Sequence, residues 1–202
     1  MTMKKDWSTL RKLIWLRRKQ DMLPSGYRKC KGFTFNNATY YVITGFRLKG
    51  SDTVRFSFSA GVACNVLGCY TTGSAQTNYS LYVGTSGAKY MRYNGGTYNS
   101  TIAVNTRYDM VMTPTGATGL PTASTWDEKT FTAESDFCIG TTSTGASSAK
   151  LTGNLYGSIK VDGRALFVPC ERSNDGVLGY YDVVGRTFYE PTGGSPVSLG
   201  YA

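Results

Sequence analysis

Short runs of alternating apolar and polar residues fill the chain after residue 22, and turn signals separate them at intervals of about 8–12 residues. In the clearest run, 53–60, Val54, Phe56 and Phe58 alternate with polar residues, so one face of this segment is expected to be buried. No helical pattern of about 10–15 residues separates the runs, which disfavours parallel βαβ units. Two packed antiparallel sheets are therefore the expected fold.

Two hairpin turns are expected between such runs. Asn94-Gly95 follows the alternating run 88–93 and supplies the positive φ angles that a two-residue turn requires. Asp162-Gly163 is a second pair of this kind, placed between two further runs. Both turns predict antiparallel neighbours joined by short connections.

Positive charge is concentrated at the start of the chain. The 202 residues hold 22 Lys and Arg against 13 Asp and Glu, which gives a formal net charge of +9. Residues 1–31 carry ten basic and two acidic residues, whereas residues 32–202 carry twelve and eleven. The total charge is typical of nucleic-acid binding, but any such surface belongs to the N-terminal segment, and we do not expect nucleic acid as the main partner.

An amphipathic helix is expected in residues 1–22. Met3, Trp7, Leu10 and Ile14 recur at spacings of four, three and four, which places them on one stripe of a helix. Three roles remain open for it: packing on its own domain, docking into a partner or another copy of the chain, and contact with an anionic membrane or nucleic acid. We favour anchoring or oligomerisation through the four apolar residues, because so short a helix is not stable alone.

Several catalytic classes are excluded by composition. The chain has no histidine, so it cannot form a Ser-His-Asp triad, a Cys-His dyad or a Cys₂His₂ zinc site. Glu134 and Asp136 are the acidic pair with the i, i+2 spacing that a retaining glycosidase could use, and a solvent-facing turn is the preferred interpretation of this pair. Asp175, next to Gly176, is also interpreted as a turn residue and not as a calcium ligand. We expect no catalytic residues, no metal and no cofactor.

The five cysteines are odd in number and include no Cys-x-x-Cys pair. They are expected to be reduced and mostly buried thiols, formed in a reducing cytoplasm. No apolar stretch approaches the ~20 residues that span a bilayer. The apolar run 13–16 is too short for the core of a signal peptide, so no membrane span or secretion signal is expected.

Residues at both ends of 23–202 carry a recognisable series of motifs. The series is, in chain order, Leu23-Pro24-x-Gly26-Tyr27, Tyr40-Tyr41-Val42-Ile43-Thr44-Gly45-Phe46, Leu155-Tyr156-Gly157-Ser158-Ile159-Lys160-Val161 before Asp162-Gly163, Phe167-Val168-Pro169-Cys170, Gly176-Val177-Leu178-Gly179-Tyr180-Tyr181-Asp182, Phe188-Tyr189 and Gly193-Gly194. This series resembles the concanavalin A-like (laminin-G-like) jelly-roll module of virion proteins from phages that infect gut bacteria. Residues 61–150 resemble this module only in the spacing of their expected strands and turns.

The resemblance implies an all-β jelly-roll sandwich over residues 23–202, exposed on the surface of a virion that is assembled in the host cytoplasm. It would serve as a head fibre, a capsid decoration or a tail-fibre component. Its implied partners are capsid or tail proteins, further copies of the chain, and host or mucus glycans. Two alternatives remain open: a capsular polysaccharide depolymerase, and a virion component whose basic arm contacts nucleic acid.

Aromatic faces beside short amides are what a metal-free glycan site requires. Tyr93, Tyr98 and Trp126, with Asn94, are the candidate glycan-binding residues. Packing inside the sandwich is the competing interpretation for each ring. A wider set of the same residue types comprises Tyr79, Tyr82, Tyr90, Asn78 and Asn99.

Overall fold

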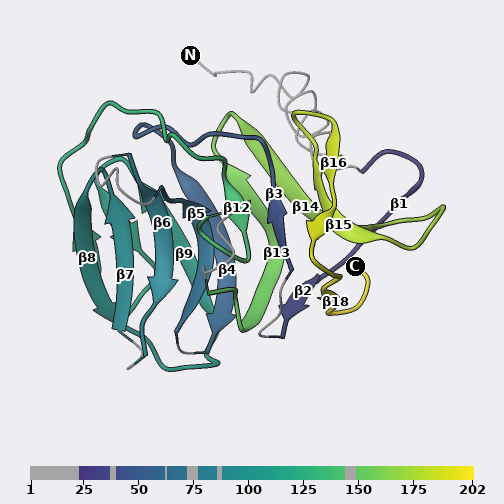
Figure 1. Cartoon of the computed structure of the whole chain (residues 1–202), viewed down its shortest axis with the longest axis horizontal. Coiled ribbons are helices and arrows are strands. Elements are labelled where there is room, and N and C mark those ends of the chain that lie inside the picture. The colour runs from purple at the N-terminus through teal and green to yellow at the C-terminus, as the bar shows by residue number, and fades with distance from the viewer. Residues whose placement is uncertain (1–22, 37–39, 62, 72–76, 86–87, 144–148) are drawn as a thin grey trace, which may run out of the picture.

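The computed structural model of the chain is an all-β protein built from two antiparallel sheets (Figure 1). It describes residues 23–36, 40–61, 63–71, 77–85, 88–143 and 149–202, and no helix occurs among them. The expected all-β, two-sheet architecture is confirmed. The amphipathic helix expected in residues 1–22 lies outside the described residues.

The larger sheet has eleven strands and contains the strand expected at residues 53–60. In order across the sheet, eight of them are β11 (Ser124–Thr125), β10 (Gly116–Thr118), β9 (Tyr108–Thr113), β4 (Val54–Ala60), β13 (Gly153–Val161), β14 (Ala165–Arg172), β15 (Leu178–Asp182) and β16 (Thr187–Tyr189). The other three are β1 (Tyr27–Lys29), which pairs with β14, β2 (Gly32–Phe35), which pairs with β13, and β18 (Val197–Ser198), which pairs with β2.

The smaller sheet has seven strands and carries the surface discussed below. Its order is β17 (Pro191–Thr192), β3 (Tyr41–Ile43), β12 (Cys138–Ile139), β5 (Cys64–Cys69), β6 (Tyr79–Val83), β7 (Ala88–Tyr93) and β8 (Gly96–Thr101). In Figure 1, β5 and β6 overlap β4 and β9 of the larger sheet, as the two layers of a sandwich do.

One hydrophobic core lies between the two sheets. Leu67, Leu81 and Met91 are fully buried and stand side by side in β5, β6 and β7. Phe137, next to β12, packs on Phe167 of β14 with 5.6 Å between ring centroids. Burial of these apolar surfaces from both layers is the main force that holds the sheets together.

Both expected hairpins are confirmed. Asn94 and Gly95 have φ angles of 47° and 82°, and Tyr93 pairs directly with Gly96 across the two-residue turn. Gly163, with φ of 72°, lies in the turn between β13 and β14. In the first hairpin the register turns Tyr93 towards the core and leaves Arg92 on the outer face, because side chains alternate along a strand.

Buried hydroxyl groups tie the smaller sheet to the loop before β4. The Tyr93 hydroxyl donates to the Gly50 carbonyl at 2.9 Å and accepts from the Lys129 N–H at 3.1 Å. The Tyr79 hydroxyl donates to the carbonyl of Asp52 at 2.9 Å. These bonds satisfy polar groups that burial would otherwise leave unpaired, and they fix the loop against β6 and β7.

Replacement of Tyr93 by Phe tests this connection. Tyr93→Phe should lower the free energy of unfolding by about 1–2 kcal/mol, because the Gly50 carbonyl and the Lys129 N–H each lose a partner. Tyr98→Phe is the matched control, since the Tyr98 hydroxyl makes no hydrogen bond within the described part of the chain. Guanidinium unfolding followed by tryptophan fluorescence measures both variants. Equal losses would contradict the proposed connection.

Candidate functional site

The outer face of the smaller sheet carries polar and aromatic side chains. Asn65 of β5 pairs with Tyr82 of β6, and Ser80 of β6 pairs with Arg92 of β7. Directly paired residues of antiparallel strands project from the same face. These four side chains alternate with core positions on their strands, so they lie together on the surface that faces away from the core.

Two adjoining hollows of about 170 and 320 Å³ lie on this face, and Tyr70 and Arg92 line both. We refer to the two together as the Tyr70–Arg92 hollow. The remaining lining residues are Thr71, Asn78, Gly95, Gly96 and Thr97 in the smaller part and Asn65, Ser80, Tyr82, Thr142 and Ala149 in the larger part.

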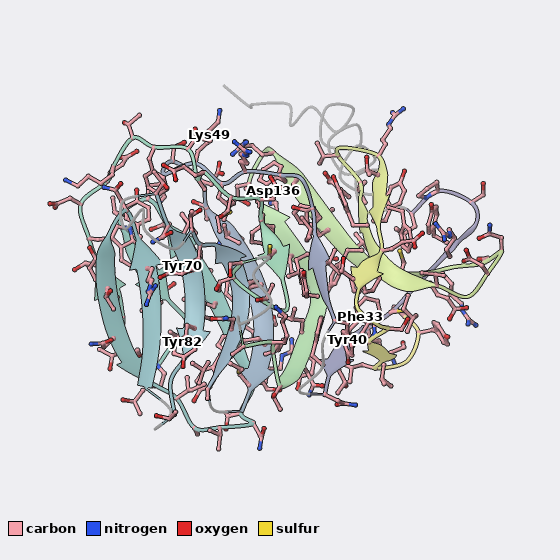
Figure 2. All side chains as sticks on the ribbon, in the orientation of Figure 1. Phe33, Tyr40, Lys49, Tyr70, Tyr82 and Asp136 are labelled. Carbon is pink, nitrogen blue, oxygen red and sulfur yellow. The ribbon has the colours of Figure 1, made fainter. Side chains whose placement is uncertain are left out.

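A cation–π contact organises the middle of the hollow. The guanidinium carbon of Arg92 lies 4.5 Å from the ring centroid of Tyr70. Both residues are half-buried, and Tyr70 and Tyr82 lie over this sheet in Figure 2. The contact restricts the rotamers of both side chains, which lowers the conformational entropy that a ligand must remove on binding.

Hydrogen bonds hold the neighbouring amides in place. The Asn78 side-chain oxygen accepts from the Thr71 N–H at 3.2 Å, and the Asn78 carbonyl accepts from the Asn94 N–H at 2.9 Å. The Asn65 side-chain nitrogen donates to the Ala149 carbonyl at 2.8 Å. The hollow is therefore a fixed platform of rings, amides and hydroxyls around one guanidinium.

No protein-family model matches this chain, and no curated protein matches its sequence at a significant level. What bears on function is therefore the chemistry of the surface itself. Within the described residues, no group of three or more His, Cys, Asp or Glu side chains is placed to hold a metal ion. None of the described segments forms a helix with the length and apolar character needed to cross a bilayer.

Two of the three expected glycan-binding rings lie inside the protein. Tyr93 and Trp126 are only 1% and 8% exposed, and their rings stack with centroids 5.1 Å apart. Tyr98 is half-buried and packs on Trp126 at 4.8 Å, while Asn94 forms the hairpin turn. For Tyr93 and Trp126 the prediction of a ligand-facing ring is wrong, because the register assigns Tyr93 to the core row and Trp126 packs against it.

The hollow is lined instead by residues from the wider candidate set and by residues that were not candidates. Tyr82 and Asn78 belong to the wider set of expected glycan contacts, and both line the hollow. Tyr70 and Arg92 were missed. The available signal was the position of Arg92 one residue before Tyr93 in an alternating run, which puts the two side chains on opposite faces.

The acidic residues considered for catalysis and calcium binding lie elsewhere. Glu134 is exposed on a bend before β12, and the carboxylate of Asp136 pairs with Arg47 at 3.4 Å. Asp175 pairs with Arg172 at 2.6 Å within a turn. The turn interpretation of these acidic segments agrees with their surface positions. The anchoring residues Met3, Trp7, Leu10 and Ile14 lie outside the described residues.

A wider hollow of about 640 Å³ lies on the outer face of the larger sheet, and Arg107 and Tyr156 are part of its lining. Arg107 pairs with Asp109 at 3.3 Å and lies 4.8 Å from the ring centroid of Tyr156. The Tyr156 hydroxyl lies 3.0 Å from both Ser59 Oγ and Asn154 Nδ2. Arg107 and Tyr156 thus have partners within the protein, and Lys31, the other charged residue of this lining, is exposed to water. The Tyr70–Arg92 hollow, in which the charged residue is half-buried, is the stronger candidate for a ligand site.

All five cysteines are buried and none forms a disulfide, as the sequence predicts. Burial raises the pKa of Cys69, Cys138 and Cys170 from 9.0 to about 12, because the thiolate is disfavoured away from water. The unfolded chain releases these protons at lower pH than the folded one does. Their contribution to stability is therefore complete below pH 9 and is lost as pH rises towards 12.

The free energy of unfolding should consequently fall above about pH 9, by up to about 1.4 kcal/mol per pH unit for each such thiol. Cys69→Ala removes one of the three groups and should make this alkaline slope shallower, whatever its effect on stability at pH 7. Urea unfolding at pH 8, 9 and 10 measures the slope in both proteins. Identical slopes would contradict the assignment of the raised pKa to buried Cys69.

Proposed function

We propose that this protein is a phage virion surface component that binds glycans through the Tyr70–Arg92 hollow. The observation that carries the proposal is the gathering of two tyrosines, amide side chains and one guanidinium on the outer face of a single sheet. Sugars present both C–H faces and hydroxyl groups. Aromatic rings bind the former and fixed amides and hydroxyls bind the latter.

Binding without hydrolysis is the activity that this lining favours. A retaining glycosidase requires two carboxylates about 5–5.5 Å apart beside the scissile bond. The lining of the hollow, as far as the structure describes it, contains amides, hydroxyls and rings but no carboxylate. We therefore propose a non-enzymatic adhesion role and do not favour a depolymerase.

The virion location rests on the order of the motifs in residues 23–202 and on the jelly-roll module that they resemble. The two-sheet antiparallel architecture is compatible with that module. In this proposal the sandwich is the exposed part of a head fibre, a capsid decoration or a tail-fibre component. Residues 1–22 attach it to a capsid or tail protein or join copies of the chain.

Tyrosine substitutions test the glycan site. Tyr70→Ala and Tyr82→Ala should each weaken binding about tenfold, because loss of an aromatic stacking face removes on the order of 1–2 kcal/mol. A glycan array followed by calorimetry with the strongest neutral or acidic hit measures this for the full chain. Tyr156→Ala, on the outer face of the larger sheet, is the matched control and should bind as the wild type does. Equal weakening in all three variants would contradict a site on the smaller sheet.

Deletion of residues 1–22 tests the attachment. The remaining chain should keep the near-ultraviolet circular dichroism of the full protein, because the core described above is built from residues after Leu23. It should lose self-association in light scattering and fail to join particles when supplied during assembly. A truncated protein that still assembles would show that the attachment lies in the sandwich.

A further inference from the structure

Arg92 is half-buried and forms no ion pair within the described residues, a combination that no other described arginine shows. Of the eight arginines that the structure describes, six form an ion pair with Asp or Glu. Within the described residues Arg92 and Arg186 form none. Arg186 is exposed in a turn, where water solvates its charge, whereas Arg92 is half-buried in the Tyr70–Arg92 hollow. Arg92 thus carries a partly desolvated charge without a counter-charge from the described protein.

The rest of the lining leaves this charge uncompensated. Neither part of the hollow is lined by a carboxylate among the described residues. A guanidinium group offers a positive charge and N–H donors but no hydrogen-bond acceptor. An anionic group on a ligand would supply the missing counter-charge.

The position of Arg92 suits an anion that presents two oxygens to it. The guanidinium carbon lies 4.5 Å from the centroid of the Tyr70 ring, and within the described residues no group accepts a hydrogen bond from the Arg92 N–H groups. Carboxylates and sulfate esters both offer two oxygens at the spacing of two such N–H groups. Thr97, the neighbour of Arg92 across β7 and β8, is exposed and adds a hydroxyl to the lining.

We propose that the Tyr70–Arg92 hollow selects acidic glycans, with a carboxylate or a sulfate ester bound by two hydrogen bonds from Arg92. The inference rests on the proposed glycan-binding function and specifies its ligand class. Nucleic acid is the less favoured polyanion, because a groove that follows a phosphate backbone requires several cations in a row. Arg92 is the one Lys or Arg among the described lining residues.

The selectivity for acidic glycans is tested with the full chain and with pairs of ligands, each an acidic glycan and its neutral counterpart. One pair is hyaluronan tetrasaccharide and its carboxyl methyl ester, and the other is 6-sulfated N-acetyllactosamine and its unsulfated parent. Calorimetry should show at least one acidic member binding about tenfold more tightly than its neutral partner, as expected for a charge-assisted bidentate contact. The pair that shows the difference identifies the carboxylate or the sulfate as the recognised group.

Three arginine variants complete the test. Arg92→Gln should remove the preference, so that the acidic and neutral members of a pair bind with similar affinity, while Arg92→Lys should keep only part of it, because lysine retains the charge but not the planar pair of donors. Arg186→Gln removes the same charge from an exposed turn and should behave as the wild type does. Circular dichroism and melting temperature confirm that each variant is folded.

The outcomes separate the two proposals. Equal binding of acidic and neutral members, or a preference that survives in Arg92→Gln, overturns the acidic selectivity and leaves glycan binding in place. No binding of any of the four ligands, together with a blank glycan array, overturns both. Binding of a single-stranded oligothymidylate that is stronger than glycan binding and is lost in Arg92→Gln overturns the inference in favour of nucleic acid.

Discussion

The register of the hairpin between β7 and β8 determines which side chains face the core and which line the Tyr70–Arg92 hollow. The turn at Asn94 and Gly95 pairs Tyr93 with Gly96 and thereby places Arg92 opposite Thr97. A shift of one residue would exchange the two faces, bury the Arg92 guanidinium without a partner and expose the Tyr93 ring. Burial of an unpaired charge carries a free-energy penalty of several kcal/mol, so the core holds the register that creates the hollow.

Buried polar contacts extend this constraint to the other sheet. The carboxylate of Asp52 pairs with Arg164 in the turn between β13 and β14, and it accepts from the Lys49 N–H at 2.7 Å. The same loop receives the hydroxyl bonds of Tyr79 and Tyr93. A buried ion pair adds little net stability over an apolar pair, but it penalises arrangements that separate its members. The loop thereby keeps the strands that carry the hollow in a fixed position on the larger sheet.

The sequence was sufficient for the strands and hairpins but not for the face that carries the Tyr70–Arg92 hollow. Alternation at 53–60 and the Asn-Gly and Asp-Gly pairs are local signals, and each corresponds to a strand or turn in the structure. Tyr82 and Tyr93 are the same residue type in similar runs, yet one lines the hollow and the other is 1% exposed. The alternation of Arg92 with Tyr93 indicates that the two face opposite sides of the sheet, but which rings and amides gather around Arg92 depends on strand pairing across β5, β6 and β7.

The charge distribution of the body is consistent with recognition at short range. Residues 32–202 are nearly neutral, and most of the described arginines are paired with acids, so the sandwich presents little net field to attract a polyanion from a distance. In the proposed site, a single half-buried guanidinium would act only on a ligand that is already seated against Tyr70 and Tyr82. Its contact is partly shielded from salt, because screening is weaker for buried pairs than for exposed ones. Affinity would then come mainly from rings and amides, with Arg92 discriminating between ligands that fit equally well in shape.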